Sequence, residues 1–136
     1  MAGSLPSPEQ RDVARALLAK AHGDEIVLTK LIEDVDVPDD ILGFHAQQAV
    51  EKLLKAVLAA SGVPFSRSHN LSYLVGLLND AGIELPGGIV ALEGLTPWAV
   101  EFRYDESSHA HLDREATLQV VVATRVWATG QANLET

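Results

Sequence analysis

The chain has 136 residues and 47% hydrophobic content, which suits one domain with a real core and leaves too little for two ordinary domains. It has no cysteine, which excludes disulfides, thiolate metal ligands and a cysteine nucleophile. Its formal net charge of −9 opposes non-specific binding to a polyphosphate backbone, so we expect no DNA partner. No apolar run approaches the roughly 20 residues of a membrane span, so we expect a soluble cytoplasmic protein without a membrane partner.

The first predicted helix begins at Ser7-Pro8-Glu9-Gln10, where serine is suited to the N-cap, proline to the first turn and glutamine to the reciprocal contact of a capping box. Apolar residues continue at helical spacing to about residue 33, so we expect one long helix that is loosened near Gly23. Its expected apolar face holds Val13, Ala14, Leu17, Leu18 and Ala21.

Residues 39–61 form the predicted central helix, in which apolar side chains cover about two thirds of the circumference. Asp39 and Asp40 are the candidates for its N-terminal cap and for partners of its helix dipole, and Gly62 suits the left-handed position after its end. The remaining narrow face carries His45, Gln48, Lys52 and Lys55, which we call the polar seam. It is either a solvated face with an ordinary Glu51–Lys55 ion pair or the wall of a cleft.

Three further helical patterns complete the chain. One begins after His69 and Asn70 and stops at Gly82; one covers residues 89–102 with a break at Thr96-Pro97; the last is capped by Asp113 and carries a stripe of Ala116, Val120, Ala123 and Trp127. We therefore predict a single all-α domain over residues 1–136, with its core at about 8–130, built as an antiparallel bundle of four to five helices. The expected core includes Leu53, Leu54, Val57, Leu74, Leu78, Val120 and Ala123.

The densest polar cluster follows the fourth pattern and holds Arg103, Asp105, Glu106, His109 and His111. An arginine can hold a phosphate and a nearby histidine can move a proton, which suffices in principle for RNA cleavage by the 2′-hydroxyl without a metal. The plainer interpretation is that Arg103 pairs with Asp105 or Glu106 at a helix end. His109 and His111 with neighbouring carboxylates, Asp113 included, give no preset metal geometry, so we expect neither a metal nor another cofactor.

Two stretches together resemble the HEPN domain, a helical nucleotide-binding bundle. They are F-H-A-Q-Q-A-V-E-K-L-L-K-A at residues 44–56, with a helix opening at His69 after it, and L-T-P-W-A-V-E-F-R-Y at residues 95–104. The resemblance implies an antiparallel bundle of the HEPN or nucleotidyltransferase-substrate-binding type that commonly dimerises. In prokaryotes it also implies pairing with a minimal nucleotidyltransferase protein, often as a toxin and its antitoxin.

Active HEPN ribonucleases carry an arginine, usually followed by a polar residue, and a histidine a few positions later, which Arg103 and His109 match. Tyr104 stands in place of the polar residue, and His111 stands where the best known toxins of the family have a tyrosine. These departures favour the branch that binds a nucleotide or substrate. The alternative is a metal-independent endoribonuclease toxin that uses Arg103 and His109.

We predict that the polar seam and the end of the fourth helix face one groove. Arg103 and Lys52 would meet phosphate, His45 and Gln48 would bond base or ribose, and Tyr104 would stack. His109 would act as a general base only if it folds back over this groove. The acidic surface favours a small nucleotide over a long RNA as ligand. The apolar excess of the central helix, with Trp98 and Trp127, predicts a homodimer.

Overall fold

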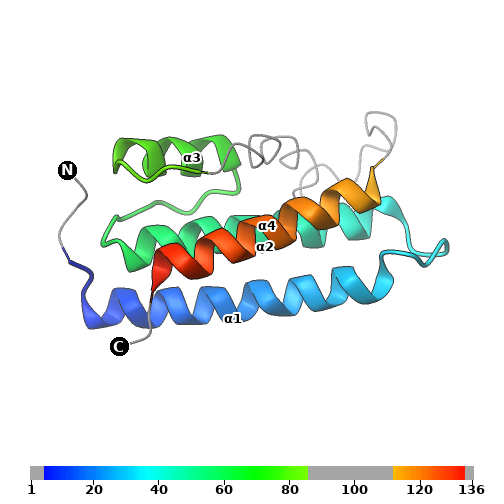
Figure 1. The fold of residues 1–136 in the computed structure, drawn as a ribbon, viewed down its shortest axis with the longest axis horizontal. Coiled ribbons are helices and arrows are strands. Elements are labelled where there is room, and N and C mark those ends of the chain that lie inside the picture. Colours follow the sequence, from blue (N-terminus) through cyan, green and yellow to red (C-terminus); the bar gives the residue numbers. More distant parts are fainter. Residues whose placement is uncertain (1–4, 86–111, 134–136) are drawn as a thin grey trace.

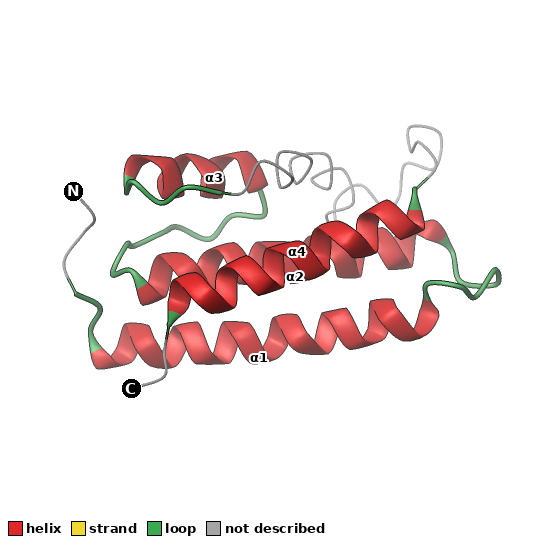
Figure 2. Ribbon diagram, viewed as in Figure 1, coloured by secondary structure: helices red, strands yellow, loops and turns green. Residues whose placement is uncertain are grey.

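The computed structural model describes residues 5–85 and 112–133. This part of the chain contains four helices and no strand (Figure 2): α1 (Pro8–Leu31), α2 (Asp39–Ala60), α3 (Leu71–Asp80) and α4 (Arg114–Ala132). The predicted all-helical bundle is confirmed. The helical pattern predicted at residues 89–102 lies outside the described residues.

Helix α2 is the centre of the described bundle, because α1, α3 and α4 all pack against it. Figure 1 shows α1 running antiparallel to α2, with α3 on the side of α2 away from α1. Helix α4 runs in the same direction as α2 and begins beside the connection between α1 and α2. The excess of apolar surface on α2 is therefore explained by neighbours on several sides.

The predicted helix starts and stops are mostly confirmed. Ser7 and Gln10 form the capping box of α1, and the side chains of Asn70 and Asp113 cap α3 and α4. Gly62 and Gly82 have φ angles of 75° and 77°, the left-handed conformation expected after a helix end.

The predicted N-terminal cap of α2 was wrong. Pro38, not Asp39 or Asp40, is the N-cap residue of α2, and no side chain caps this end. The two aspartates lie in the first turn, where their charge favours the helix dipole, and this part of the prediction is confirmed. The single long first helix is confirmed: α1 runs through Gly23 as one continuous helix, and only the loosening expected at this residue is not seen.

The core centres on α2, and the predicted Leu53, Leu54, Val57, Leu74 and Leu78 are all buried in it. The predicted faces of α1 and α4 need correction. Val13 is 47% exposed, and on α4 Ala116 and Ala123 are exposed while Val120 and Trp127 are half-buried. The buried positions of α4 are Thr117, Val121, Thr124, Ala128 and Ala132.

The buried threonines explain why the stripe of α4 was misplaced by about one position. The Thr124 hydroxyl donates a hydrogen bond of 2.6 Å to the Val120 carbonyl oxygen, so this polar group is satisfied within its own helix. The sequence prediction used only the spacing of apolar residues, and it therefore placed the threonines of this helix on the surface. Here the threonine side chains face the core, and Val126, two residues after Thr124, is 60% exposed.

One arginine joins the start of α4 to the connection between α1 and α2. Arg114 Nε donates to Asp39 Oδ1 at 3.0 Å, and its two terminal nitrogens donate to three backbone carbonyl oxygens. The three carbonyls belong to Ile32, Asp34 and Val37. This side chain fixes the corner at which three helices meet (Figure 1).

Candidate functional site

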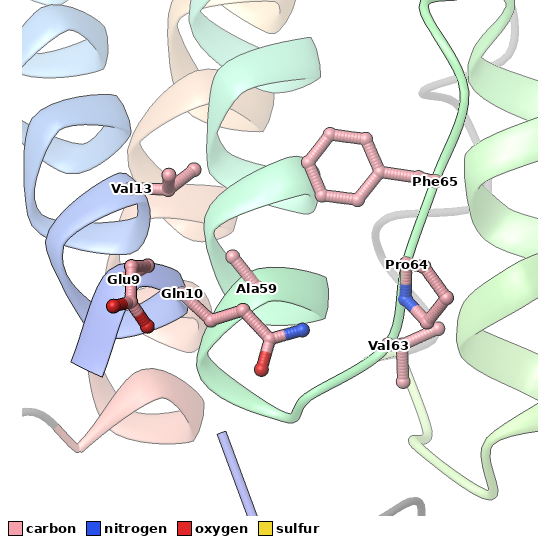
Figure 3. Close-up of a pocket in the computed structure, with 7 residues that line it drawn as sticks. All are labelled: Glu9, Gln10, Val13, Ala59, Val63, Pro64 and Phe65. Atoms are coloured by element: carbon pink, nitrogen blue, oxygen red, sulfur yellow. The ribbon is translucent and has the colours of Figure 1, made fainter. Parts of the chain in front are cut away.

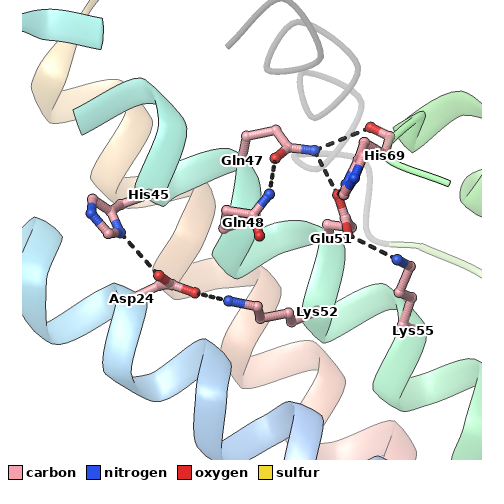
Figure 4. Close-up of polar contacts among 8 residues, drawn as sticks. All are labelled: Asp24, His45, Gln47, Gln48, Glu51, Lys52, Lys55 and His69. Atoms are coloured by element: carbon pink, nitrogen blue, oxygen red, sulfur yellow. Dashed lines mark hydrogen bonds and ion pairs between the residues drawn. The ribbon is translucent and has the colours of Figure 1, made fainter. Parts of the chain in front are cut away.

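The polar seam of α2 divides into two groups of contacts (Figure 4). On one side His45 and Lys52 reach Asp24 of α1, and on the other Gln48 and Lys55 join a network around Gln47 and Glu51. We call the first the Asp24 group and the second the Glu51 network. The structure therefore brings His45 and Lys52 together, whereas Gln48 belongs to the other group.

The Asp24 group places one carboxylate between two side chains of α2. His45 Nδ1 lies 2.9 Å from Asp24 Oδ1, and Lys52 Nζ donates to Asp24 Oδ2 at 2.5 Å. An ionised carboxylate can only accept hydrogen bonds, so His45 Nδ1 carries the proton. The side chains of His45 and Lys52 remain 27% and 22% exposed, against 12% for Asp24.

The Glu51 network is more deeply buried. Glu51 Oε2 accepts from Lys55 Nζ at 2.8 Å, and Oε1 contacts Gln47 Nε2 at 3.0 Å and His69 Nδ1 at 2.9 Å. The fully buried Gln47 also donates to the His69 carbonyl oxygen and accepts from Gln48 Nε2. These contacts tie α2 to the segment that leads into α3.

The pKa of Glu51 reflects two opposing effects. Burial favours the neutral acid and would raise it, but hydrogen bonds from Lys55, Gln47 and His69, with the charge of Lys55, bring it below its ordinary value of 4.5. The carboxylate is therefore ionised at neutral pH. The expected Glu51–Lys55 ion pair exists, but as part of a buried network instead of a solvated helix face.

Sequence reasoning missed Asp24, which is half-buried beside the core face of α1, and Gln47, which is buried in α2. Asp24 stands seven residues from both Leu17 and Leu31, parallel to the buried series Ala14, Ala21 and Leu28. Gln47 and Glu51 begin a buried series that continues through Leu54 and Leu58. The sequence did offer a signal, namely a charged or amide side chain at the spacing of buried positions. Such a side chain needs a hydrogen-bond partner from another helix or loop.

The other predicted site residues, Arg103, Tyr104 and His109, lie outside the described residues, as do Asp105, Glu106 and His111. Their predicted roles stay predictions. Asp113, the remaining candidate in that cluster, is the N-cap of α4 and accepts a hydrogen bond from the Ala116 amide. Within residues 5–85 and 112–133, no group of three or more histidines and carboxylates is placed to hold a metal ion.

A separate pocket of about 260 Å³ lies between the start of α1 and the end of α2 (Figure 3). Val13 and Ala59 contribute from the two helices, and the loop after α2 contributes the rest of its apolar wall. Its complete lining is Glu9, Gln10, Val13, Ala59, Val63, Pro64 and Phe65. It shares no residue with either polar group of α2.

The described part of the chain is a helical bundle whose central helix carries polar groups at its contacts with α1 and with the segment that leads into α3 (Figure 4). The sequence model of the HEPN domain family matches residues 14–129. The chain therefore belongs to the HEPN domain family, as the motifs predicted. No curated protein and no solved structure gave a significant match. None of the described helices is both long enough and apolar enough to span a membrane.

Proposed function

We propose that this HEPN protein is the nucleotide- or substrate-binding partner of a minimal nucleotidyltransferase, in a module of the toxin–antitoxin type. The observation that carries the proposal is the Asp24 group, a half-buried cluster of titratable and charged side chains on a helix otherwise committed to the core. The histidine and the lysine of this group are partly exposed, and both have hydrogen-bonding atoms that an anionic ligand can use.

The chemistry of the Asp24 group suits an anionic ligand. Lys52 uses one of its three ammonium protons on Asp24, so further donors remain for a phosphate oxygen. His45 presents Nε2 on the side of the ring opposite its bond to Asp24, where it can bond a ribose hydroxyl, a base or, when protonated, a phosphate. Arg103 and Tyr104 are proposed to complete the site by binding phosphate and stacking on the base.

Charge favours a small ligand over a long nucleic acid. The formal net charge of −9 repels an extended phosphate backbone, whereas a nucleotide needs only a few local contacts. Gln48 would join the contacts to base or ribose if its bond to Gln47 were exchanged for one to the ligand.

The alternative function is a metal-independent endoribonuclease, and the specific observation in its favour is the spacing of Arg103 and His109. In that reaction His109 would take the proton of a ribose 2′-hydroxyl as its oxygen bonds to the adjacent phosphorus, and Arg103 would stabilise the charge on the phosphate oxygens. The bond from phosphorus to the 5′-oxygen of the next nucleotide would break, that oxygen would take a proton from solvent, and a 2′,3′-cyclic phosphate would remain. Tyr104 and His111 depart from the pattern of the active enzymes, which is why binding without cleavage is the first proposal.

Assembly is also part of the proposal. We propose a homodimer working in the cytoplasm with the nucleotidyltransferase. The exposed apolar side chains Val13 and Ile26 on α1 and Val126 on α4 support it, because association would cover them. Trp127 gives less support than its sequence suggested, since its indole nitrogen donates to the Glu84 carbonyl oxygen within the chain. Light scattering at micromolar concentration tests the dimer, and a monomer would contradict it.

The binding function is tested by calorimetric titration of nucleotides into the wild type, Arg103→Ala and His109→Ala, with an RNA cleavage assay run in chelator. The proposal expects binding that is lost with Arg103→Ala and kept with His109→Ala, and no cleavage. Chelator-resistant cleavage abolished by either substitution would establish the ribonuclease instead. Equal behaviour of all three proteins would remove Arg103 and His109 from the site.

A further inference from the structure

We infer that Asp24 is a positioning residue of the nucleotide site, which holds His45 and Lys52 in the arrangement that receives an anionic group of the ligand. The inference rests on the proposed function and assigns a role to a residue of α1 that carries no sequence motif. Asp24 itself does not touch the ligand; it acts through the two side chains of α2.

The geometry fixes the His45 ring from two directions. Asp24 Oδ1 bonds Nδ1 at 2.9 Å, and the Phe44 ring meets the imidazole edge to face, with centroids 5.5 Å apart and planes inclined by 72°. The bond to Asp24 places the proton on Nδ1 and leaves Nε2 for the ligand. The same carboxylate holds Lys52 Nζ, which removes most of the rotational freedom of a long side chain before the ligand arrives.

Stability alone is a weak reason for this cluster. Asp24 stands one heptad before Leu31, which packs against the core, and an apolar side chain at Asp24 would contact α2 at no desolvation cost. Replacing a buried or half-buried ion pair by apolar residues is often neutral or stabilising. Retaining three polar groups at a helix contact is therefore better explained by what the two outward-facing groups do.

The direction in which Asp24→Asn changes the affinity for an anionic ligand shows whether Asp24 acts by positioning the other two side chains or only through its charge. Removing a carboxylate beside an anion site strengthens anion binding if charge alone matters, because a repulsive group is lost. If Asp24 positions His45 and Lys52, the same substitution weakens binding, because the amide keeps only one, weaker acceptor oxygen and turns an NH2 donor towards the other group. Asp24→Glu tests the same point in a second way, because it keeps the negative charge but displaces the carboxylate by one methylene. Only a positioning role predicts weaker binding in this variant.

The chain offers a matched control in the next residue. Glu25 is also a carboxylate of α1 in a contact between helices, accepting from Arg125 Nε of α4 at 2.8 Å. Glu25→Gln removes the same charge and a comparable ion pair without touching α2. It therefore reports the general effect of one less negative charge and of one less contact of α1.

The experiment titrates ADP and inorganic pyrophosphate into the wild type, Asp24→Asn, Asp24→Glu and Glu25→Gln by calorimetry, after circular dichroism has confirmed that each is folded. We expect about tenfold or greater loss of affinity in both Asp24 variants, the loss of one charge-assisted hydrogen bond, and at most a small gain in Glu25→Gln. Either Asp24 variant suffices if the other does not fold.

A spectroscopic signature distinguishes positioning from a merely structural role. Long-range ¹H–¹⁵N spectra of the imidazole groups show which nitrogen of His45 is protonated. We expect the Nδ1–H form in the wild type and Glu25→Gln, and a shift towards the Nε2–H form in both Asp24 variants. ADP should perturb the His45 Nε2 resonance of the wild type.

The outcomes separate this inference from the proposed function. Unchanged or tighter binding in the Asp24 variants, or an unchanged His45 tautomer, overturns the role of Asp24. If binding is lost with Arg103→Ala at the same time, the nucleotide site stands without it. If the wild type binds neither ADP nor pyrophosphate, both the inference and the proposed function fail.

Discussion

Arg114 offers the sharpest test of how the bundle is held together. Its guanidinium donates to Asp39 Oδ1 and to the carbonyl oxygens of Ile32, Asp34 and Val37, at distances from 2.6 to 3.1 Å. Truncation by Arg114→Ala removes all four bonds and the link between α4 and the α1–α2 connection. We predict a substantial loss of folding stability from this one change.

The magnitude follows from the environment of these bonds. A hydrogen bond to a charged group contributes about 1.5–3 kcal/mol when it is shielded from water. Arg114 and Asp39 keep 24% and 25% of their side-chain exposure, and the freed carbonyls of this corner can bond water, so each bond is worth much less than that range. Four such bonds together should contribute about 2–4 kcal/mol, and Arg114→Lys should recover only part because it lacks the planar fork.

Urea denaturation followed by circular dichroism measures this difference in the free energy of unfolding. Arg125→Ala is the matched control, because Arg125 makes a single interhelical ion pair to Glu25 and is 40% exposed, which predicts a loss of at most about 1 kcal/mol. A loss in Arg114→Ala no larger than in Arg125→Ala would refute the view that Arg114 joins three helices.

Three further predictions concern stability. Gly23→Ala should stabilise the protein by about 0.5–1 kcal/mol in thermal or urea denaturation, because the residue lies within a helix and an added Cβ meets nothing within 4 Å. Gly82→Ala should destabilise it, because the φ angle of Gly82 is +77°. A change of the same sign in both variants would contradict this. Folding lowers the pKa of Glu51, so the stability that this carboxylate contributes is present above its ordinary pKa of 4.5 and is lost as the pH falls through its folded pKa. Glu51→Gln should lower the free energy of unfolding by about 1–3 kcal/mol at pH 7, and its melting temperature should fall less steeply than that of the wild type towards acid pH. An unchanged acid dependence would argue against the Glu51 network. Leu53→Ala should cost about 2–5 kcal/mol in a denaturation series, and a loss below about 0.5 kcal/mol would mean that α2 is not the centre of the core.

Local chemistry explains what could be predicted of the fold. The capping box at Ser7 and Gln10 and the glycines after α2 and α3 act within a few residues, so the sequence contains the whole interaction. Apolar residues cover so much of the surface of α2 that its burial can be predicted without knowing which elements pack against it. These are the features that the structure confirms.

The remaining features depend on partners far away along the chain. Asp24 is explained only by His45 and Lys52, which come 21 and 28 residues later. Thr124 faces the core because its hydroxyl is satisfied by its own helix, which an apolar pattern does not record. Asp39 was expected to cap α2, but its carboxylate contacts α4, and this depends on how the two helices pack.

Binding of a nucleotide by the polar seam of α2 is tested by titrating the ¹⁵N-labelled protein with ADP and following its amide and imidazole chemical shifts. We expect saturable shifts concentrated at His45, Gln48 and Lys52 and at Asp24 across the helix contact. Saturable shifts confined to residues outside α1 and α2, or no shifts at millimolar ADP, would contradict it.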